Sequence, residues 1–219
     1  MLLRTPGSPG DRQLRIRLHL DHPEHGELWL NFVDQRIFGS MAVDSMQATS
    51  DGMPAGFAGA AAGDWSSLIP SQVAHIARDP IDPAFSPDVF LSALARRKTG
   101  IKRALLDQTL ISGIGNIYAD EALFAARLHY NQQADSLARP KATLLLQAVR
   151  TILDRALAEG GTSFDAQYVN VNGESGYFSH SLTAYGQQGQ PCPRCGTTLV
   201  REQFMNRSSH LCPRCQRLR

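Results

Sequence analysis

The four cysteines of this chain of 219 residues lie near its C-terminus, in two Cys-x-x-Cys pairs. They are Cys192, Cys195, Cys212 and Cys215. Thiolates at this spacing are typical ligands of a tetrahedral zinc ion, with one pair on each side of the metal. A pair of redox dithiols fits less well, because no βαβ pattern precedes the cysteines. We therefore expect one structural Zn2+, without an open position for catalysis, in a β-hairpin that holds Arg207 near its tip.

A second group of metal-type side chains consists of His19, His22 and His25, which are spaced by three residues. The spacing crosses a turn that contains Pro23, so it does not place the three rings on one face of a helix. We interpret the group as part of a surface hairpin and not as a metal site.

Basic side chains are concentrated in two stretches, although the net charge of the chain is only +2. One stretch, residues 191–219, contains six arginines and a single acid, Glu202. The other is the cluster of Arg96, Arg97, Lys98, Lys102 and Arg103. Such patches favour a polyanionic partner, while a solvated charged surface explains the charge alone equally well.

A glycine-rich turn, SGIGN at residues 112–116, separates two helical patterns at residues 102–110 and 117–126. Glycine lets a backbone approach a ligand closely, and the turn leaves backbone N–H groups exposed at the start of the second helix. Such a helix end favours phosphate through its free donors and its dipole. With Lys98 and Lys102 just upstream, the segment indicates a phosphate-binding helix–turn–helix.

The elements that position these residues change from strands to helices along the chain. Alternating apolar residues predict strands at residues 14–20 and 27–33, and residues 36–43 indicate a third. Residues 46–87 are rich in Gly, Ala, Pro and Asp, which predicts a connector with one short helix. Helical spacing follows at residues 88–95, 102–110, 117–126 and 140–158, so we expect an α+β protein.

No apolar run of the chain is long enough to cross a bilayer, and its first residues lack the apolar core of a signal peptide. We expect a protein of the reducing cytoplasm with no membrane partner. In that compartment paired cysteines favour a metal over a disulfide.

Together these segments resemble the formamidopyrimidine-DNA glycosylase family of bacterial base-excision repair enzymes. The resemblance rests on DQRIFG (34–39), RRKTGIKRALLDQ (96–108), SGIGNIYADEAL (112–123), GGTSFDAQYVNVNGESGYF (160–178), AYGQQGQPCPRCG (184–196) and NRSSHLCPRCQ (206–216). It implies binding of damaged double-stranded DNA, excision of oxidised purines by Schiff-base chemistry, and strand nicking as an AP lyase. It also implies a monomer of the bacterial cytoplasm, associated with the nucleoid.

The resemblance implies an α+β fold: the remnant of an N-terminal antiparallel β-lobe, a helix–two-turn–helix lobe and a C-terminal zinc-finger β-hairpin. The expected boundaries are a partial β-sandwich lobe at 1–45, a connector at 46–87, the helix–two-turn–helix DNA-binding domain at 88–165, a lesion-loop region at 166–190 and the zinc finger at 191–219.

The resemblance also assigns DNA-binding roles to Arg36, Phe38, Lys98, Lys102, Asn116 and Arg207. According to the resemblance, Asn116 binds a phosphate beside the lesion, and Lys98 is a DNA-contacting lysine. Arg36 and Phe38 fill the gap left by the extruded base. Arg207 contacts the phosphate and is the catalytic proton donor in δ-elimination.

The chain departs from the family pattern at its start. Family members begin Pro-Glu-Leu-Pro-Glu and use the terminal proline amine as nucleophile, whereas Met1-Leu2-Leu3 resembles a strand beyond that segment. Nothing in these residues supplies the amine with its partner carboxyl and lysine. The sequence therefore predicts either a misassigned start or a truncated protein, a catalytically inactive, zinc-dependent DNA-binding module. A zinc ribbon that only docks proteins is disfavoured, because it needs neither the GIGN turn nor Arg207.

Overall fold

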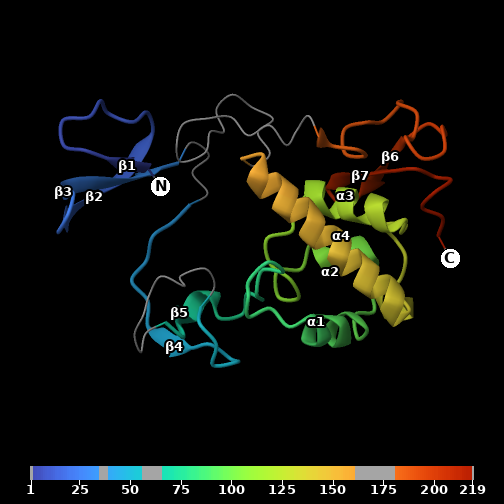
Figure 1. Ribbon diagram of the computed structural model, residues 1–219, viewed down its shortest axis with the longest axis horizontal. Helices are drawn as coiled ribbons and strands as arrows, with labels where there is room; N and C mark the ends of the chain where they lie inside the picture. The colour runs from blue at the N-terminus through green and yellow to red at the C-terminus, as the bar shows by residue number, and fades with distance from the viewer. Residues whose placement is uncertain (1, 35–38, 56–65, 161–180, 219) are drawn as a thin grey trace. The chain divides into compact units, whose positions relative to one another are not determined.

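The computed structural model describes residues 2–34, 39–55, 66–160 and 181–218 (Figure 1). The chain divides into two compact units, one in residues 1–43 and the other beginning at Asp44. Antiparallel sheets and helices both occur, so the expected α+β class is confirmed. None of the helices in the described ranges is long and apolar enough to cross a membrane.

The first unit is a three-stranded antiparallel sheet in the order β1-β3-β2, made of Leu2–Arg4, Gly26–Val33 and Leu14–His22 respectively. Alternate residues of a strand share one face, and the pairs Leu18–Leu30 and Leu20–Leu28 make one face apolar. The strands β2 and β3 agree with the alternation in the sequence. Residues 39–43 form no strand, and the third place in the sheet is taken by β1 instead.

The second unit begins with a small sheet and continues with helices. Its elements are β4 (Met46–Ala48), β5 (Leu68–Pro70), η1 (Ser71–Val73), α1 (Pro87–Leu94), α2 (Ile101–Leu105), α3 (Asn116–Ala126), η2 (Ala134–Ser136), α4 (Arg139–Ala158), β6 (Val200–Phe204) and β7 (Arg207–Leu211). The helix α4 packs mainly against α3 and also against α1. Their apolar faces, together with α2, enclose a core that includes Ile101, Leu105, Leu123 and Leu145, each at most 1% exposed.

Local sequence explains where the helices begin and end. The Oγ of Ser86 accepts a hydrogen bond from the backbone N–H of Val89 at the start of α1. The helix α2 ends earlier than its apolar spacing predicts, because the Asp107 carboxylate accepts hydrogen bonds from both the N–H and the hydroxyl of Thr109. This local turn competes with a further helical turn. It directs the chain into the glycine-rich segment that precedes α3.

The helix α3 lies beside the β6–β7 hairpin, which forms part of the C-terminal segment in Figure 1. Three residues on one side of α3, spaced by four, face the C-terminal segment: Asn116 and Asp120 contact β7, and Phe124 packs against two of the four cysteines. The Asn116 amide donates to the Ser208 carbonyl at 3.1 Å, and the Asp120 carboxylate accepts from the His210 N–H at 2.9 Å. Four helical residues rise about 6 Å and two strand residues about 6.7 Å, so the two elements stay in register.

Candidate nucleic-acid interface

The four cysteine sulfurs converge on one point, and all lie within 4.8 Å of one another. The Sγ of Cys195 is 3.5 Å from the Sγ of Cys212 and 3.5 Å from that of Cys215. A tetrahedron with metal–sulfur bonds of about 2.3 Å has edges of about 3.8 Å, so the thiols fit zinc. The hydrogen bond with Thr197 lowers the pKa of Cys195 to about 6, while burial raises the pKa of Cys215 to about 12 and that of Cys212 as well, so binding of the metal must release protons from these two thiols. The four thiols fill the coordination shell, so the ion would be structural.

Two side chains join the metal-binding knuckles to the end of α3. The Arg194 guanidinium donates to the Phe124 carbonyl and lies 4.2 Å from the centre of the Phe124 ring. The Gln216 side chain accepts from the Cys212 N–H and donates to the Leu128 carbonyl, both at 2.9 Å. Since Gln216 is only 1% exposed, these bonds are shielded from water. The knuckles are therefore fixed to the helical core.

A buried carboxylate on α3 holds the segment that leads into the zinc finger. Glu121 is 5% exposed and accepts backbone hydrogen bonds from Thr183, Ala184 and Tyr185 at 2.8 to 3.1 Å. Three N–H donors on one carboxylate satisfy its charge without a cation. The sequence reasoning did not identify Glu121. The signal that the sequence offered was an acidic residue with apolar neighbours in an amphipathic helix.

Lys102, which the resemblance assigns to DNA binding, is buried within the protein. Its side chain is 0% exposed, and its ammonium group is 2.7 Å from an oxygen of Asp120. It also donates to the Ser208 carbonyl at 2.9 Å and to the Ser209 hydroxyl at 2.8 Å. Burial lowers the pKa of Lys102, and the Asp120 charge opposes that shift. A lysine has three donors, and all three are used within the protein, so the phosphate contact expected of Lys102 would require these bonds to be exchanged and stays a prediction.

An open hollow of about 590 Å³ lies at the N-terminus of α3, and we name it the α3 pocket. Its lining comprises Asn116, Ile117, Tyr185, Gly186, Gln188, Arg201, Arg207, Ser208 and His210. No side chain caps the helix, so backbone N–H groups of its first turn remain available to a ligand. Two arginines line the hollow, and no carboxylate side chain does. This combination of helix end and guanidinium groups suits an anion, and phosphate in particular.

The α3 pocket brings together Asn116 and Arg207, which the sequence reasoning proposed from distant segments. The Oδ1 atom of Asn116 is buried with no hydrogen-bond partner among the described residues. Its Nδ2 atom donates to Ser208, which fixes the side chain against the hairpin. Arg201, which the sequence reasoning missed, is held by a 2.7 Å hydrogen bond to the Ser208 hydroxyl.

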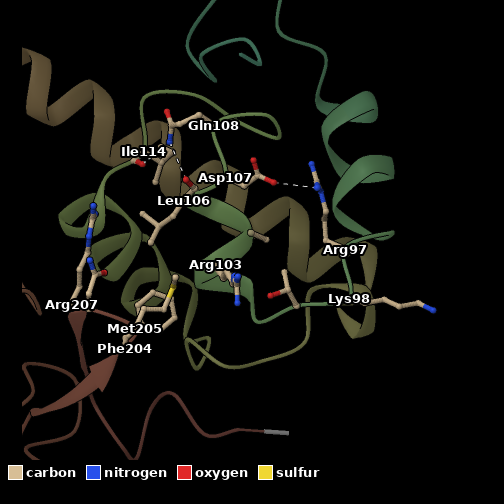
Figure 2. A pocket seen from close by; sticks show the side chains of 13 residues that line it. Arg97, Lys98, Arg103, Leu106, Asp107, Gln108, Ile114, Phe204, Met205 and Arg207 are labelled. Carbon is tan, nitrogen blue, oxygen red and sulfur yellow. Dashed lines mark hydrogen bonds and ion pairs between the residues drawn. The ribbon is translucent and has the colours of Figure 1, made fainter. Parts of the chain in front are cut away.

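A second hollow, of about 780 Å³, lies between the hairpin turn and the segment around α2, and we name it the hairpin groove (Figure 2). Lys98 is exposed and lines this groove, and in Figure 2 its side chain points away from the others drawn. Arg207 lines both hollows. Two further predicted DNA contacts, Arg36 and Phe38, lie outside the described residues, as do residues 166–180 of the predicted lesion-loop region.

Comparison with known proteins relates these features to one family. Residues 76–167 match the formamidopyrimidine-DNA glycosylase H2TH domain, and residues 189–218 match a zinc finger found in FPG and IleRS. A formamidopyrimidine-DNA glycosylase of Leifsonia xyli is 65% identical over 218 residues, which are 100% of this chain and 72% of that protein. One of Kineococcus radiotolerans is 53% identical over 216 residues, which are 99% of this chain and 69% of that protein.

Solved structures give the same result. The Lactococcus lactis Fpg, in complex with DNA that contains an abasic site, is similar with a TM-score of 0.70 and 26% identity, covering 99% of this chain and 70% of that one. The MutM (Fpg) protein of Thermus thermophilus is similar with a TM-score of 0.69 and 31% identity. The match covers 100% of this chain and 73% of that one. The resemblance noted from the sequence motifs is thereby confirmed.

Proposed function

The chain belongs to the formamidopyrimidine-DNA glycosylase family, and from this premise we propose that it binds damaged double-stranded DNA and acts in base-excision repair. The α3 pocket carries the proposal, because it combines an uncapped helix end with two arginines and no carboxylate. A phosphodiester group fits this combination. The chain acts on duplex DNA as a monomer, in the bacterial cytoplasm at the nucleoid.

Binding at the α3 pocket relies on two elements with separate contributions. The N–H groups of the first turn of α3, with the Asn116 side chain beside them, donate to one phosphate. Arg207, the first residue of β7, donates from the hairpin, and a guanidinium can form two parallel hydrogen bonds to a phosphate. Arg201 adds a second positive charge. Such contacts position the duplex and carry no base-sequence information, so affinity depends on salt more than on sequence.

The family's reaction, in full-length relatives, is removal of an oxidised purine by an attacking amine and nicking of the strand, and we propose that this chain provides the DNA-binding residues of that reaction. The damaged nucleotide leaves the base stack to be processed, and Arg36 and Phe38 fill the gap that it leaves. Lys98 contacts the DNA, and Arg207 is the proton donor in δ-elimination at the abasic site. Zn2+, held by the four cysteines, stabilises the hairpin that presents Arg207 and takes no part in the chemistry.

Binding to a duplex with one central tetrahydrofuran abasic-site analogue tests the DNA-binding proposal, with zinc-loaded protein at 50 to 200 mM salt. We expect the logarithm of the association constant to fall linearly with the logarithm of the salt concentration, as phosphate contacts require. An intact duplex of the same length is the control, and it should bind more weakly. Absence of duplex binding at low salt would overturn the proposal.

Borohydride trapping on a duplex with 8-oxoguanine tests the reaction separately. A covalent adduct between protein and DNA supports Schiff-base chemistry, since borohydride reduces the imine between an amine and the sugar. Binding without an adduct supports the alternative of a DNA-binding module that does not excise bases. A duplex with guanine in place of 8-oxoguanine is the control and should give no adduct.

A further inference from the structure

We propose that the hairpin groove binds the sugar–phosphate backbone next to the phosphate in the α3 pocket, and that Arg103 is a phosphate-binding residue there. The inference rests on the proposed DNA binding and extends it by a second site on the same strand. The sequence places Arg103 in a basic cluster, but neither its motifs nor the comparisons assign it a contact with DNA.

The groove has a positive charge that the protein does not neutralise. Its lining includes four basic residues, Arg97, Lys98, Arg103 and Arg207, and one acid, Asp107. Asp107 is already occupied, since Arg97 pairs with it at 3.2 Å and Thr109 donates to it. Among the described residues, the side chains of Lys98, Arg103 and Arg207 have no hydrogen bond or ion pair. Three uncompensated cations around one groove favour a polyanion.

The groove continues the site already described, because Arg207 lines both hollows. In Figure 2, Arg103 and Arg207 flank the side chains of Leu106 and Met205. A DNA strand whose phosphate lies in the α3 pocket can therefore pass Arg207 and enter the groove. Arg103 is the next arginine that the strand meets.

The lining of the groove contains both charged and apolar side chains. Apolar side chains of Leu106, Ile114 and Met205 lie among the cations. A deoxyribose ring is less polar than the phosphates on either side of it, so it suits this apolar surface while the phosphates meet the arginines. A small inorganic anion would leave the apolar part of the groove in contact with water.

The first test is Arg103→Gln in the zinc-loaded full chain, with the abasic-site duplex. Loss of one phosphate contact should reduce the slope of log K against log salt by about 0.9 and weaken binding about eightfold at 0.1 M salt. Arg103→Lys keeps the charge and should keep most of the slope. Arg127→Gln is the matched control, because Arg127 is exposed at the C-terminal end of α3 and does not line the groove.

The second test replaces single phosphates of the duplex by uncharged methylphosphonates. We expect one phosphate whose replacement removes the effect of Arg103→Gln on DNA binding. Replacement of a neighbouring phosphate should remove the effect of Arg207→Ala in the same way. If the wild type binds and Arg103→Gln binds with the same slope and affinity, the inference is wrong and the proposed function stands. If the wild type binds no duplex, both fail.

Discussion

At the scale of single residues, the positions of Lys102 and Asn116 show what sequence motifs reveal and what they omit. Both belong to motifs that indicate phosphate binding, yet only Asn116 reaches the α3 pocket. Lys102 lies in the same basic cluster as Arg103, but its acceptors are on Asp120, Ser208 and Ser209, far along the chain. No spacing within the cluster tells which lysine is buried. Arg201 was missed for the same reason, since its place depends on the pairing of β6 with β7.

Lys102→Met tests whether this lysine positions the hairpin or contacts DNA. The substitution leaves the Asp120 charge buried without its cation, so the free energy of unfolding should fall by roughly 3–5 kcal/mol. The slope of log K against log salt should stay unchanged if all three Lys102 donors remain bonded within the protein. Chemical denaturation and salt titration of DNA binding measure the two effects.

The matched control is Lys102→Met combined with Asp120→Asn, which removes the unpaired charge and keeps an acceptor for the His210 N–H. Part of the lost stability should return in this double variant. A salt slope reduced by about 0.9 with unchanged stability would instead show that Lys102 reaches a phosphate.

At the scale of elements, long periodic segments could be predicted and short ones could not. The strands β2 and β3 and the helix α4 have enough positions for alternation or helical spacing to be visible in the sequence. The strands β1, β4 and β5 have three residues each, too few for a pattern, and their pairing partners determine them. Residues 46–87, expected as a connector, contain the β4–β5 pair and a network around Arg78.

Arg78 makes the segment around β4 sensitive to acid. It donates to the two oxygens of Asp51 at 2.6 and 2.7 Å and to Asp82 at 3.0 Å. Its hydrogen bond lowers the pKa of Asp51 from 3.8 to about 2. A carboxyl group whose pKa is lower in the folded protein than in the unfolded one stabilises the fold at pH values above its unfolded pKa. This stabilisation should therefore disappear as the pH falls from about 4 to 2.

Thermal unfolding followed across that pH range, for the wild type and for Asp51→Asn, measures this contribution. The variant should be less stable than the wild type at pH 7, and the difference should shrink toward pH 2. A difference that is constant over the whole range would show that Asp51 does not titrate with a depressed pKa.

At the scale of the whole molecule, the zinc finger is held to the helical core by α3. Asn116, Asp120 and Phe124 contact the hairpin and the knuckles, while Glu121 holds the segment that precedes them. The sequence predicted the zinc ligands because their spacing is local and specific. It could not predict that two adjacent acids of α3 hold His210 of the hairpin and the segment before the finger, since these partners are more than sixty residues away.

Removal of zinc should therefore abolish DNA binding and leave the helical core folded. Purified protein should contain one zinc per chain by metal analysis, and a chelator or Cys212→Ser should unfold the hairpin, because the metal contributes folding free energy directly. The helical circular dichroism signal should largely persist, since helix residues make up most of the apolar core and the hairpin adds only Phe204 and Leu211 among its fully buried described members. Restoring zinc to the chelated wild type is the control, and it should restore binding. Full DNA affinity in zinc-free protein would contradict this account.

The central claim is that the N-terminus of α3 and the zinc hairpin together form a phosphate site for DNA. Its most direct test is the salt dependence of duplex binding by the zinc-loaded wild type and by Arg207→Ala. The account predicts a linear plot for both, with weaker binding and a slope smaller by about 0.9 in the variant, and unchanged zinc content. An Arg207→Ala variant that binds the abasic-site duplex with the wild-type affinity and slope would contradict the claim.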